Sequence, residues 1–247
     1  MRKMQLNEKF FDNIDSEEKA YLLGFFLADG CISHNNNWYS NSNSLTITLT
    51  EEDSYVIEWF KQFIAYSYKI STFHNKKGAV NRKPVKRIKW SSKYMSSVLQ
   101  NEYSILPNKT KDLFFKFPFE KIQKEYLFDF IRGFFDGDGN ISFYENKKYF
   151  NFGFYSTSEY FLNQLGSIFK KEFKCNFKVD ITKKNNKVIL YYLRFNLGNN
   201  LTKYELFKKI YNKFYKEKKF FLLRKKSKLE LYLNTVLNKE TNKSLSV

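Results

Sequence analysis

The sequence predicts an α+β protein made of two tandem copies of one αββαββα unit, related by a pseudo-twofold axis. The main observation is a ten-residue pattern, G-F-F-x-small-D-G-x-I-S, which occurs without a gap in residues 24–33 and again in 133–142. The same order of helical and strand patterns follows each copy. The halves are predicted to be residues 1–115 and 116–247, because prolines break the pattern between the two repeats.

The repeated pattern lies at the end of a mostly apolar helix in each half. The first helix is predicted from Asp15 to Asp29, because Asp15 and Glu18 form a capping box and Gly30 can serve as a left-handed cap. The second helix is predicted from near Glu120 to Asp138, with Gly139 in the same capping role.

Strands and further helices are predicted after each copy. Strict alternation in residues 44–50 predicts a half-buried strand, and residues 55–63 have helical spacing. Residues 141–156 predict a hairpin, and a helix follows it. Each half then continues with a second strand pair and a helix, which in the second half is a lysine-rich helix over 203–228. The second strand pairs are predicted at 66–74 with 84–90, and at 176–182 with 187–195.

The charge of the chain predicts a polyanionic partner. The formal net charge is +18, from 43 Lys and Arg against 25 Asp and Glu, which favours nucleic acid over an anionic membrane surface. Short, charge-interrupted apolar runs predict that nothing spans a membrane, and the N-terminus lacks the apolar stretch of a secretory signal. Two distant cysteines and two histidines exclude zinc modules and H-N-H or H-E-x-x-H active sites. Any hydrolytic chemistry is therefore expected to use carboxylates, lysines and a hard metal ion.

Small residues recur every four positions on both predicted motif helices, namely Gly24, Ala28, Gly133 and Gly137. Glycine inside a helix costs about 1 kcal/mol relative to alanine, so the pattern predicts that the two helices pack closely. That packing would bring together Asp29 and Asp138, each at the negative end of a helix dipole. Two acids in such places are expected to be held by a cation, whereas a single copy would be explained as a simple helix-end residue. Carboxylates and helix-end carbonyls suit Mg²⁺.

The segments LLGFFLADG and IRGFFDGDG, together with the helix and strand repeat, resemble the paired motifs of the LAGLIDADG homing endonuclease family over nearly the whole chain. The first segment departs from the common pattern at several apolar positions. The resemblance implies that the motif helices pack at the domain interface and that the antiparallel sheets form a DNA-binding saddle. It also implies a monomeric, site-specific endonuclease that cuts both strands of duplex DNA at a long, pseudo-symmetric or asymmetric target and promotes intron homing.

The same resemblance implies a metal site. Mg²⁺ is the expected cofactor, and Mn²⁺ or Ca²⁺ is expected to substitute for it in binding. Asp29 and Asp138 are the expected ligands and catalytic carboxylates, with Ala28 and Gly137 contributing through the main chain. Asp136 has Leu27 opposite it in the other copy, and we therefore expect a structural or supporting role for it.

The family resemblance further implies a lysine near each scissile phosphate. In the first half LPNKTK makes Lys109 the candidate, with Lys111 and Lys116 as rivals. In the second half FYKEKKFFLLRKK makes Lys216 or Lys218 the candidate. A plain phosphate contact is the alternative for each lysine.

Two further polar residues fall where the family places water-positioning groups. They are Glu51 and Ser158, and helix capping explains them equally well.

The outward face of the strands and the loop tips are the expected DNA surface. Lys and Arg there would contact phosphates, while Asn, Thr and Arg could read base edges, although a solvated face explains each one equally well. The candidates are Asn35, Trp38, Tyr39, Thr46, Thr48, Lys86, Lys89, Asn146, Lys147, Lys178, Lys183 and Arg194.

Two other functions stay open at this point. One is a group I intron RNA maturase, which would bind its own intron RNA. The other is a catalytically inert DNA-binding regulator, although intact acids in both copies favour cleavage. The bias toward Lys, Asn, Phe, Tyr and Ile suggests an A/T-rich gene. This composition points to an organelle (mitochondrion or plastid), a bacterium or a phage, and the protein is not expected to be secreted.

Overall fold

The computed structural model describes residues 5–34, 43–73, 83–144, 149–184, 188–196 and 200–244. The chain divides into two compact units. The first consists of Met1–Lys109 and Phe117–Gly137, and the second of Thr110–Lys116 and Asp138–Val247. This division follows contacts, whereas the predicted halves follow the sequence repeat, so the predicted boundary stays a prediction. Among the described residues, no helix combines the length and the apolar character needed to span a membrane.

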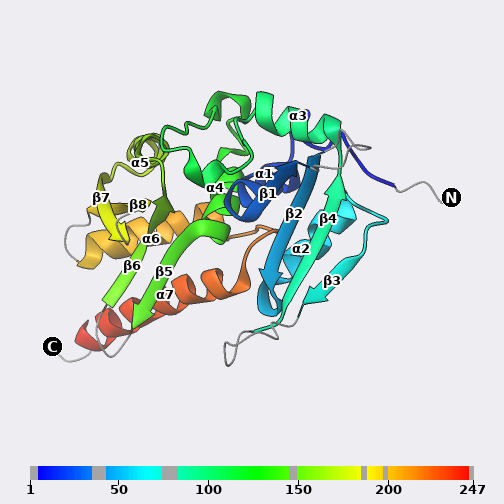
Figure 1. Ribbon diagram of the computed structural model, residues 1–247. Coiled ribbons are helices and arrows are strands. Elements are labelled where there is room, and N and C mark those ends of the chain that lie inside the picture. Colours follow the sequence, from blue (N-terminus) through cyan, green and yellow to red (C-terminus); the bar gives the residue numbers. More distant parts are fainter. Residues whose placement is uncertain are drawn as a thin grey trace. The chain divides into compact units, whose positions relative to one another are not determined.

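The first unit contains a four-stranded antiparallel sheet with the strand order β1-β2-β4-β3 (Figure 1). Its strands are β1 (Gly30–His34), β2 (Asn43–Thr50), β3 (Ile70–Phe73) and β4 (Val85–Ser91). Its helices are α1 (Glu17–Asp29), α2 (Tyr55–Phe63), α3 (Lys93–Asn101) and α4 (Leu127–Asp138), and the last residue of α4 belongs to the second unit. Short 3-10 turns lie at Glu51–Asp53, Lys109–Lys111 and Phe119–Lys121.

The second unit repeats this sheet, with the strand order β5-β6-β8-β7. Its strands are β5 (Gly139–Tyr144), β6 (Tyr149–Ser156), β7 (Asn176–Lys184) and β8 (Val188–Asn196). Its helices are α5 (Glu159–Phe173), α6 (Asn200–Phe214) and α7 (Leu223–Ser244).

The predicted α+β fold with two antiparallel sheets is confirmed. In both units the first strand begins at the glycine that follows a motif aspartate. Gly30 pairs with Ile47, and Gly139 pairs with Phe154. These two pairs give a common origin from which positions in the two sheets can be compared.

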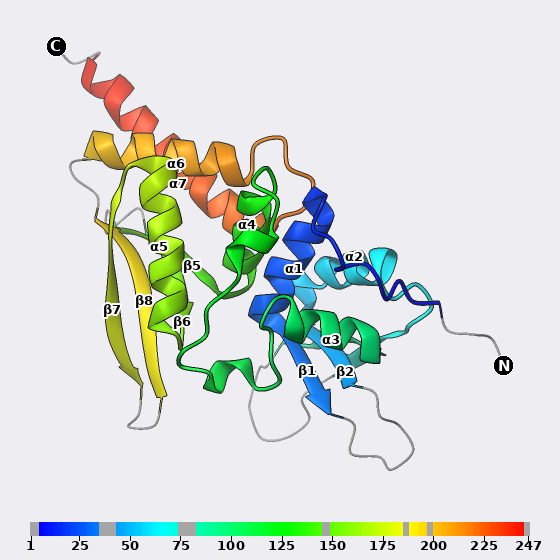
Figure 2. The same cartoon turned by 90° about the horizontal axis from the view of Figure 1, so that it is seen from above.

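Each sheet is covered on one face by helices, as Figure 2 shows for α1 and α2 against β1 and β2, and for α5 beside β7 and β8. Aromatic side chains fill the space between these layers. In the first unit the rings of Phe26, Phe60 and Trp90 lie 6.1–6.5 Å apart and are buried. In the second unit Phe169 contacts Phe195 at 4.7 Å between ring centroids. The high aromatic content of the sequence is thus used in both cores.

Several local predictions were wrong. The cap of α1 is Ser16, whose side chain accepts a hydrogen bond from the Lys19 amide, while Asp15 instead pairs with Lys19 at 2.7 Å. Gly30 has φ −74°, so it is no left-handed cap. Glycine is needed there because a side chain would start 2.4 Å from the Phe26 carbonyl oxygen.

The predicted boundaries of two helices were also wrong. Helix α4 begins at Leu127, because the residues after Pro118 form a 3-10 turn and an irregular segment instead. The helix predicted over 203–228 is two helices, α6 and α7, and Glu217 between them has a positive φ of 58°. A left-handed residue of this kind ends a helix.

Candidate active site and nucleic-acid interface

The two motif helices touch through their main chains, as their glycines predicted. A side chain at Gly24 would begin 2.0 Å from the carbonyl oxygen of Phe130, and one at Gly133 would begin 2.1 Å from the carbonyl oxygen of Tyr21. Real Cβ atoms do not approach oxygen so closely, so both positions require glycine. Helices α1 and α4 therefore cross at backbone contact within the first unit.

Asp29 and Asp138 are the last residues of α1 and α4, and both are exposed although most residues before them are buried. The Asp29 carboxylate lies beside Gly137, where its Oδ2 is 3.1 Å from the point at which a side chain would begin. A side chain there would also start 2.3 Å from the Cβ of Ala28. Because position 137 has no side chain, the main chain of Gly137 can lie close to Ala28 and to the Asp29 carboxylate.

The chemistry of these groups fits a hard cation. They are carboxylate and main-chain carbonyl oxygens at helix ends, which is the donor type that Mg²⁺ takes. Three or more His, Cys, Asp or Glu side chains do not gather into a metal-binding group anywhere in the described ranges. A metal at Asp29 would accordingly need main-chain oxygens, water or substrate oxygens to complete its coordination.

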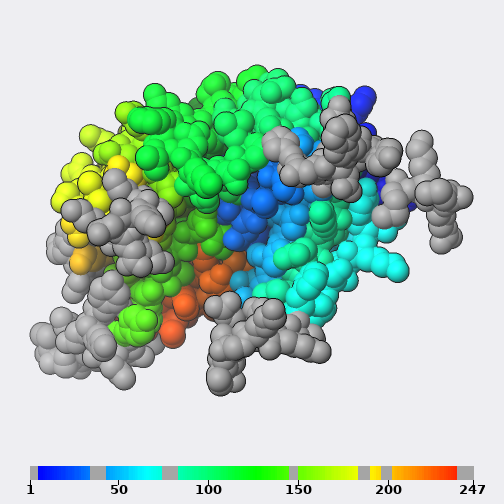
Figure 3. All heavy atoms as spheres, viewed as in Figure 1, coloured from blue at the N-terminus to red at the C-terminus, as the bar shows by residue number. Residues whose placement is uncertain are grey.

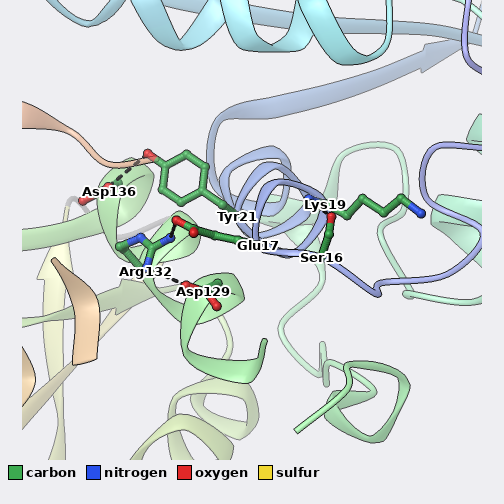
Figure 4. A network of polar contacts seen from close by, with 7 residues as sticks. All are labelled: Ser16, Glu17, Lys19, Tyr21, Asp129, Arg132 and Asp136. Atoms are coloured by element: carbon green, nitrogen blue, oxygen red, sulfur yellow. Dashed lines mark hydrogen bonds and ion pairs between the residues drawn. The ribbon is translucent and has the colours of Figure 1, made fainter. Parts of the chain in front are cut away.

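A buried polar network ties α1 to α4 (Figure 4). Arg132 has no exposed side-chain surface, and it donates to Asp129 at 2.6 Å and to Glu17 at 3.0 Å. Tyr21 donates its hydroxyl to the buried carboxylate of Asp136 at 3.0 Å. Burial, and then the negative charge of Asp136, raises the pKa of Tyr21 well above its usual value. The contact to Tyr21 fits the structural role expected for Asp136.

Lys109, the candidate lysine of the first half, reaches the end of the first motif helix. Its Nζ donates to the carbonyl oxygen of Phe26 at 3.0 Å and to that of Gly30, and these two residues flank Asp29 in sequence. A cation is favoured at the C-terminal end of a helix, so helix capping is part of this role. The structure brings Lys109 to the main chain on both sides of Asp29.

Lys225 makes the corresponding contact in the second unit. Its Nζ donates to the carbonyl oxygen of Gly139 at 2.7 Å, and the residue is only 2% exposed. Lys216, the lysine predicted for this half, has a 62% exposed side chain that lies 4.0 Å from Glu217. The structure therefore places Lys225, and not Lys216, in the position equivalent to Lys109.

Sequence reasoning missed Lys225 although the segment quoted for the second half contains it. That segment holds many lysines, and their spacing does not favour one over another. Only the packing of α7 against β5 selects Lys225.

In the first unit the helix-free face of the sheet carries polar and basic side chains. The register pairs Lys89 with Thr46 and Arg87 with Thr48, while Ile47 and Ile88 are buried on the opposite face. Figure 3 shows this part of the sheet, coloured blue and cyan, at the molecular surface. The predicted outward placement of Thr46, Thr48 and Lys89 is therefore consistent with the register.

The outward placement predicted for Lys86 was wrong. Lys86 pairs with Leu49 and lies on the same face as Ile88, because residues two apart in a strand share a face. Arg87 occupies the outward position instead. Its Nε donates to Thr48 Oγ1 at 3.0 Å, and its guanidinium lies 4.6 Å from the ring centroid of Phe73.

In the second unit Lys178 and Arg194 are neighbours across β7 and β8, with side chains 59% and 51% exposed. Asp180 accepts from both, at 2.8 Å from Lys178 and 2.7 Å from Arg194. The hydrogen bond from Lys178 is the main cause that lowers the pKa of Asp180, and Arg194 adds to it. Tyr192 lies next to this cluster, where its ring is 4.6 Å from that of Tyr155 and its hydroxyl donates to Asn151.

The remaining candidate DNA contacts cannot be placed. Lys183 lies in β7, but its side chain is outside the described residues. The loop-tip candidates are outside the described residues altogether, namely Asn35, Trp38, Tyr39, Asn146 and Lys147.

Comparison with known proteins agrees with this geometry. The family model of the LAGLIDADG-like domain matches residues 125–211, which contain the second motif. The homing endonuclease I-WcaI, solved bound to its DNA recognition sequence, is 16% identical and has a TM-score of 0.52, with 93% of this chain and 94% of that chain covered. The chain thus shares the fold of this endonuclease, and its residues 125–211 resemble the LAGLIDADG-like domain. A lysine-to-alanine mutant of I-SmaMI is 13% identical with a TM-score of 0.51, over 94% of each chain. Among curated protein sequences nothing matches the chain.

The two polar residues that the resemblance offered for positioning water, Ser158 and Glu51, make different contacts. Ser158 accepts from the Phe161 amide at 3.3 Å and donates to the Phe115 carbonyl at 2.7 Å, so the capping alternative is the one that the structure supports. Glu51 is exposed and begins a 3-10 turn, where its carbonyl accepts from Ser54.

Proposed function

We propose that this protein is a site-specific, metal-dependent LAGLIDADG endonuclease that cuts both strands of duplex DNA. One repeated arrangement carries the proposal. In each copy an exposed aspartate ends a motif helix, and the glycine after it accepts a hydrogen bond from a lysine, Lys109 in one copy and Lys225 in the other. A structural role for either aspartate alone would not require the lysine to recur with it.

The proposed cofactor is Mg²⁺, for which Mn²⁺ or Ca²⁺ substitutes in binding. Asp29 and Asp138 hold the metal, with main-chain oxygens of Ala28 and Gly137 as the other protein donors. A bound divalent ion supplies an activated water and stabilises the leaving oxygen of a phosphodiester. The chain itself supplies fixed positive charge through the Lys109 and Lys225 ammonium groups, whose hydrogen bonds to main-chain carbonyls hold them in place.

The substrate is duplex DNA bound along the helix-free faces of the sheets. A net charge of +18 and the outward Arg87, Lys89, Lys178 and Arg194 support this, as does the DNA-bound state of I-WcaI. Two motif copies on one chain support a monomer. The biological role that follows is homing of the intron that encodes the protein, and the maturase alternative has no observation here in its favour.

The test begins with a randomised duplex library, from which the protein selects its target. The selected duplex is then incubated with the full chain in Mg²⁺, and nicked and linear products are separated. Asp29→Asn and Asp138→Asn should each abolish cleavage and leave binding within a few fold. Glu58→Gln, which alters an exposed carboxylate on α2, is the control and should cut normally. The proposal fails if both single aspartate variants still cut both strands.

A further inference from the structure

We propose that Arg87 and Arg194 each read a guanine in the target, and that they do so from non-equivalent positions of their two sheets. The proposal rests on the proposed DNA-cleaving function. Of these two arginines, the sequence placed Arg194 among many candidate DNA contacts and gave no reason to select Arg87.

The first observation is that both arginines are held by a partner at Nε. Arg87 Nε donates to Thr48 Oγ1 at 3.0 Å, and the Phe73 ring lies against the guanidinium. Arg194 Nε lies 2.7 Å from Asp180 Oδ2. Contact at Nε leaves the two terminal amino groups directed past the partner. Two parallel donors of this kind match O6 and N7 of guanine in the major groove.

The second observation is that Asp180 lies on the face that would meet DNA. A carboxylate there repels phosphate, so its presence needs a reason. It accepts from Arg194 and from Lys178, and this bridging fixes both cations relative to β7 and β8. Phosphate attraction alone would be stronger without Asp180. An acid that positions an arginine improves discrimination between bases at the expense of non-specific affinity.

The third observation is the register. Ile47 pairs with Gly30 and Phe154 pairs with Gly139, which gives both sheets the same origin. Arg87 pairs with Thr48, which is the residue after Ile47 in β2. Arg194 pairs with Gly153, which is the residue before Phe154 in β6. The two arginines therefore occupy positions that differ by two residues along equivalent strands.

This offset has a size in DNA. Two residues of antiparallel strand span about 7 Å, and base pairs rise about 3.4 Å each. Measured from the origin of each sheet, the two guanine contacts should thus differ by about two base pairs. In β8 the counterpart of Arg87 is Tyr192, and in β4 the counterpart of Arg194 is Lys89.

Neither counterpart is arranged to read guanine in the same way. Tyr192 donates its hydroxyl to Asn151 and packs on Tyr155, so it presents no pair of donors. Lys89 is exposed, and no ion pair or hydrogen bond fixes its ammonium within the described part of the chain. A mobile ammonium suits a phosphate contact. Recognition at equivalent positions of the two sheets is accordingly different.

The experiment is binding selection from a randomised duplex library in Ca²⁺, with the wild-type chain and with each variant. The wild type should select one guanine for each arginine. Arg87→Ala should lose the preference at one of these base pairs only, and Arg194→Ala at the other only, each by about tenfold to a hundredfold. Lys89→Ala is the control, and it should weaken binding equally for all sequences.

Asp180→Asn gives an independent readout. It should lose preference at the base pair that Arg194→Ala affects, while affinity for random duplex stays the same or rises. A role in folding alone would lower affinity for every duplex. The proposal is overturned if the arginine variants weaken binding uniformly, or if both variants lose preference at the same base pair. If the wild type neither selects nor cleaves duplex, the proposed function fails instead.

Discussion

The backbone contact between α1 and α4 makes Gly24 the position where the smallest change should have a large effect. In Gly24→Ala the new Cβ would start 2.0 Å from the Phe130 carbonyl oxygen and 2.9 Å from the Phe134 amide nitrogen. Both obstacles are main-chain atoms, so no side-chain rotation relieves them. An ordinary contact needs about 3.4 Å, and the helices must therefore separate by about 1.4 Å or bend.

The expected cost follows from two opposing terms. Overpacking of this kind costs about 3 kcal/mol, at the upper end of the usual range, because the backbone must move. Alanine returns about 1 kcal/mol through its better helix propensity. The net loss in the free energy of unfolding should be about 2 kcal/mol. With a urea dependence of about 2 kcal/mol per molar, the midpoint should fall by about 1 M.

Urea unfolding followed by tryptophan fluorescence measures this effect in the first unit, because Trp59 and Trp90 belong to it and residues 110–247 contain no tryptophan. Gly166→Ala is the matched control in α5. There the new Cβ would meet only side-chain atoms of Phe177, at 2.4 Å from Cδ2 and 2.7 Å from Cγ, which rotation about the Cα–Cβ bond of Phe177 can move. Circular dichroism of Gly166→Ala should show a midpoint within about 0.5 M of the wild type. A Gly24→Ala protein as stable as the wild type would refute the reasoning about helix contact.

Three further predictions concern the buried network and the lysines. Tyr21→Phe should lower the free energy of unfolding by about 1–3 kcal/mol, because the buried Asp136 carboxylate loses a donor, and an unchanged urea midpoint would contradict this. Because burial and Asp136 raise the Tyr21 pKa, its neutral form is favoured in the folded state. This contribution to the free energy of unfolding is complete below about pH 10 and is lost as pH rises through the folded pKa of Tyr21. Between pH 9 and 12 the free energy of unfolding, measured by fluorescence, should therefore fall less steeply with pH in Tyr21→Phe than in the wild type. Lys225→Met should reduce cleavage of the selected duplex by about a hundredfold, whereas Lys216→Met should stay near the wild type; the reverse order would restore Lys216 as the active lysine.

The elements that were predictable from the sequence are those whose pattern is local. Alternation in 44–50 gave strand β2, and the repeated glycines gave the close helix contact through Gly24 and Gly133. What could not be predicted depends on register or on long-range packing. The side on which Lys86 lies follows from its pairing with Leu49, and the choice of Lys225 follows from how α7 meets β5. A lysine-rich segment contains no local signal for which ammonium will be buried.

The two motif helices also differ in a way that the shared motif hides. Asp129, Arg132 and Asp136 of α4 align with Ala20, Leu23 and Leu27 of α1, so the buried charges are on one helix only. Their partners Glu17 and Tyr21 are on the other helix. A pairing of two α4 helices would bury these charges without those partners, at a cost of several kcal/mol. The network therefore selects the pairing of unlike helices, α1 with α4. The same asymmetry appears on the sheets, where Arg87 has Tyr192 as its counterpart. The copies have kept the aspartate, the glycine and the lysine contact in common, while the interior and the DNA-facing surface distinguish one half from the other.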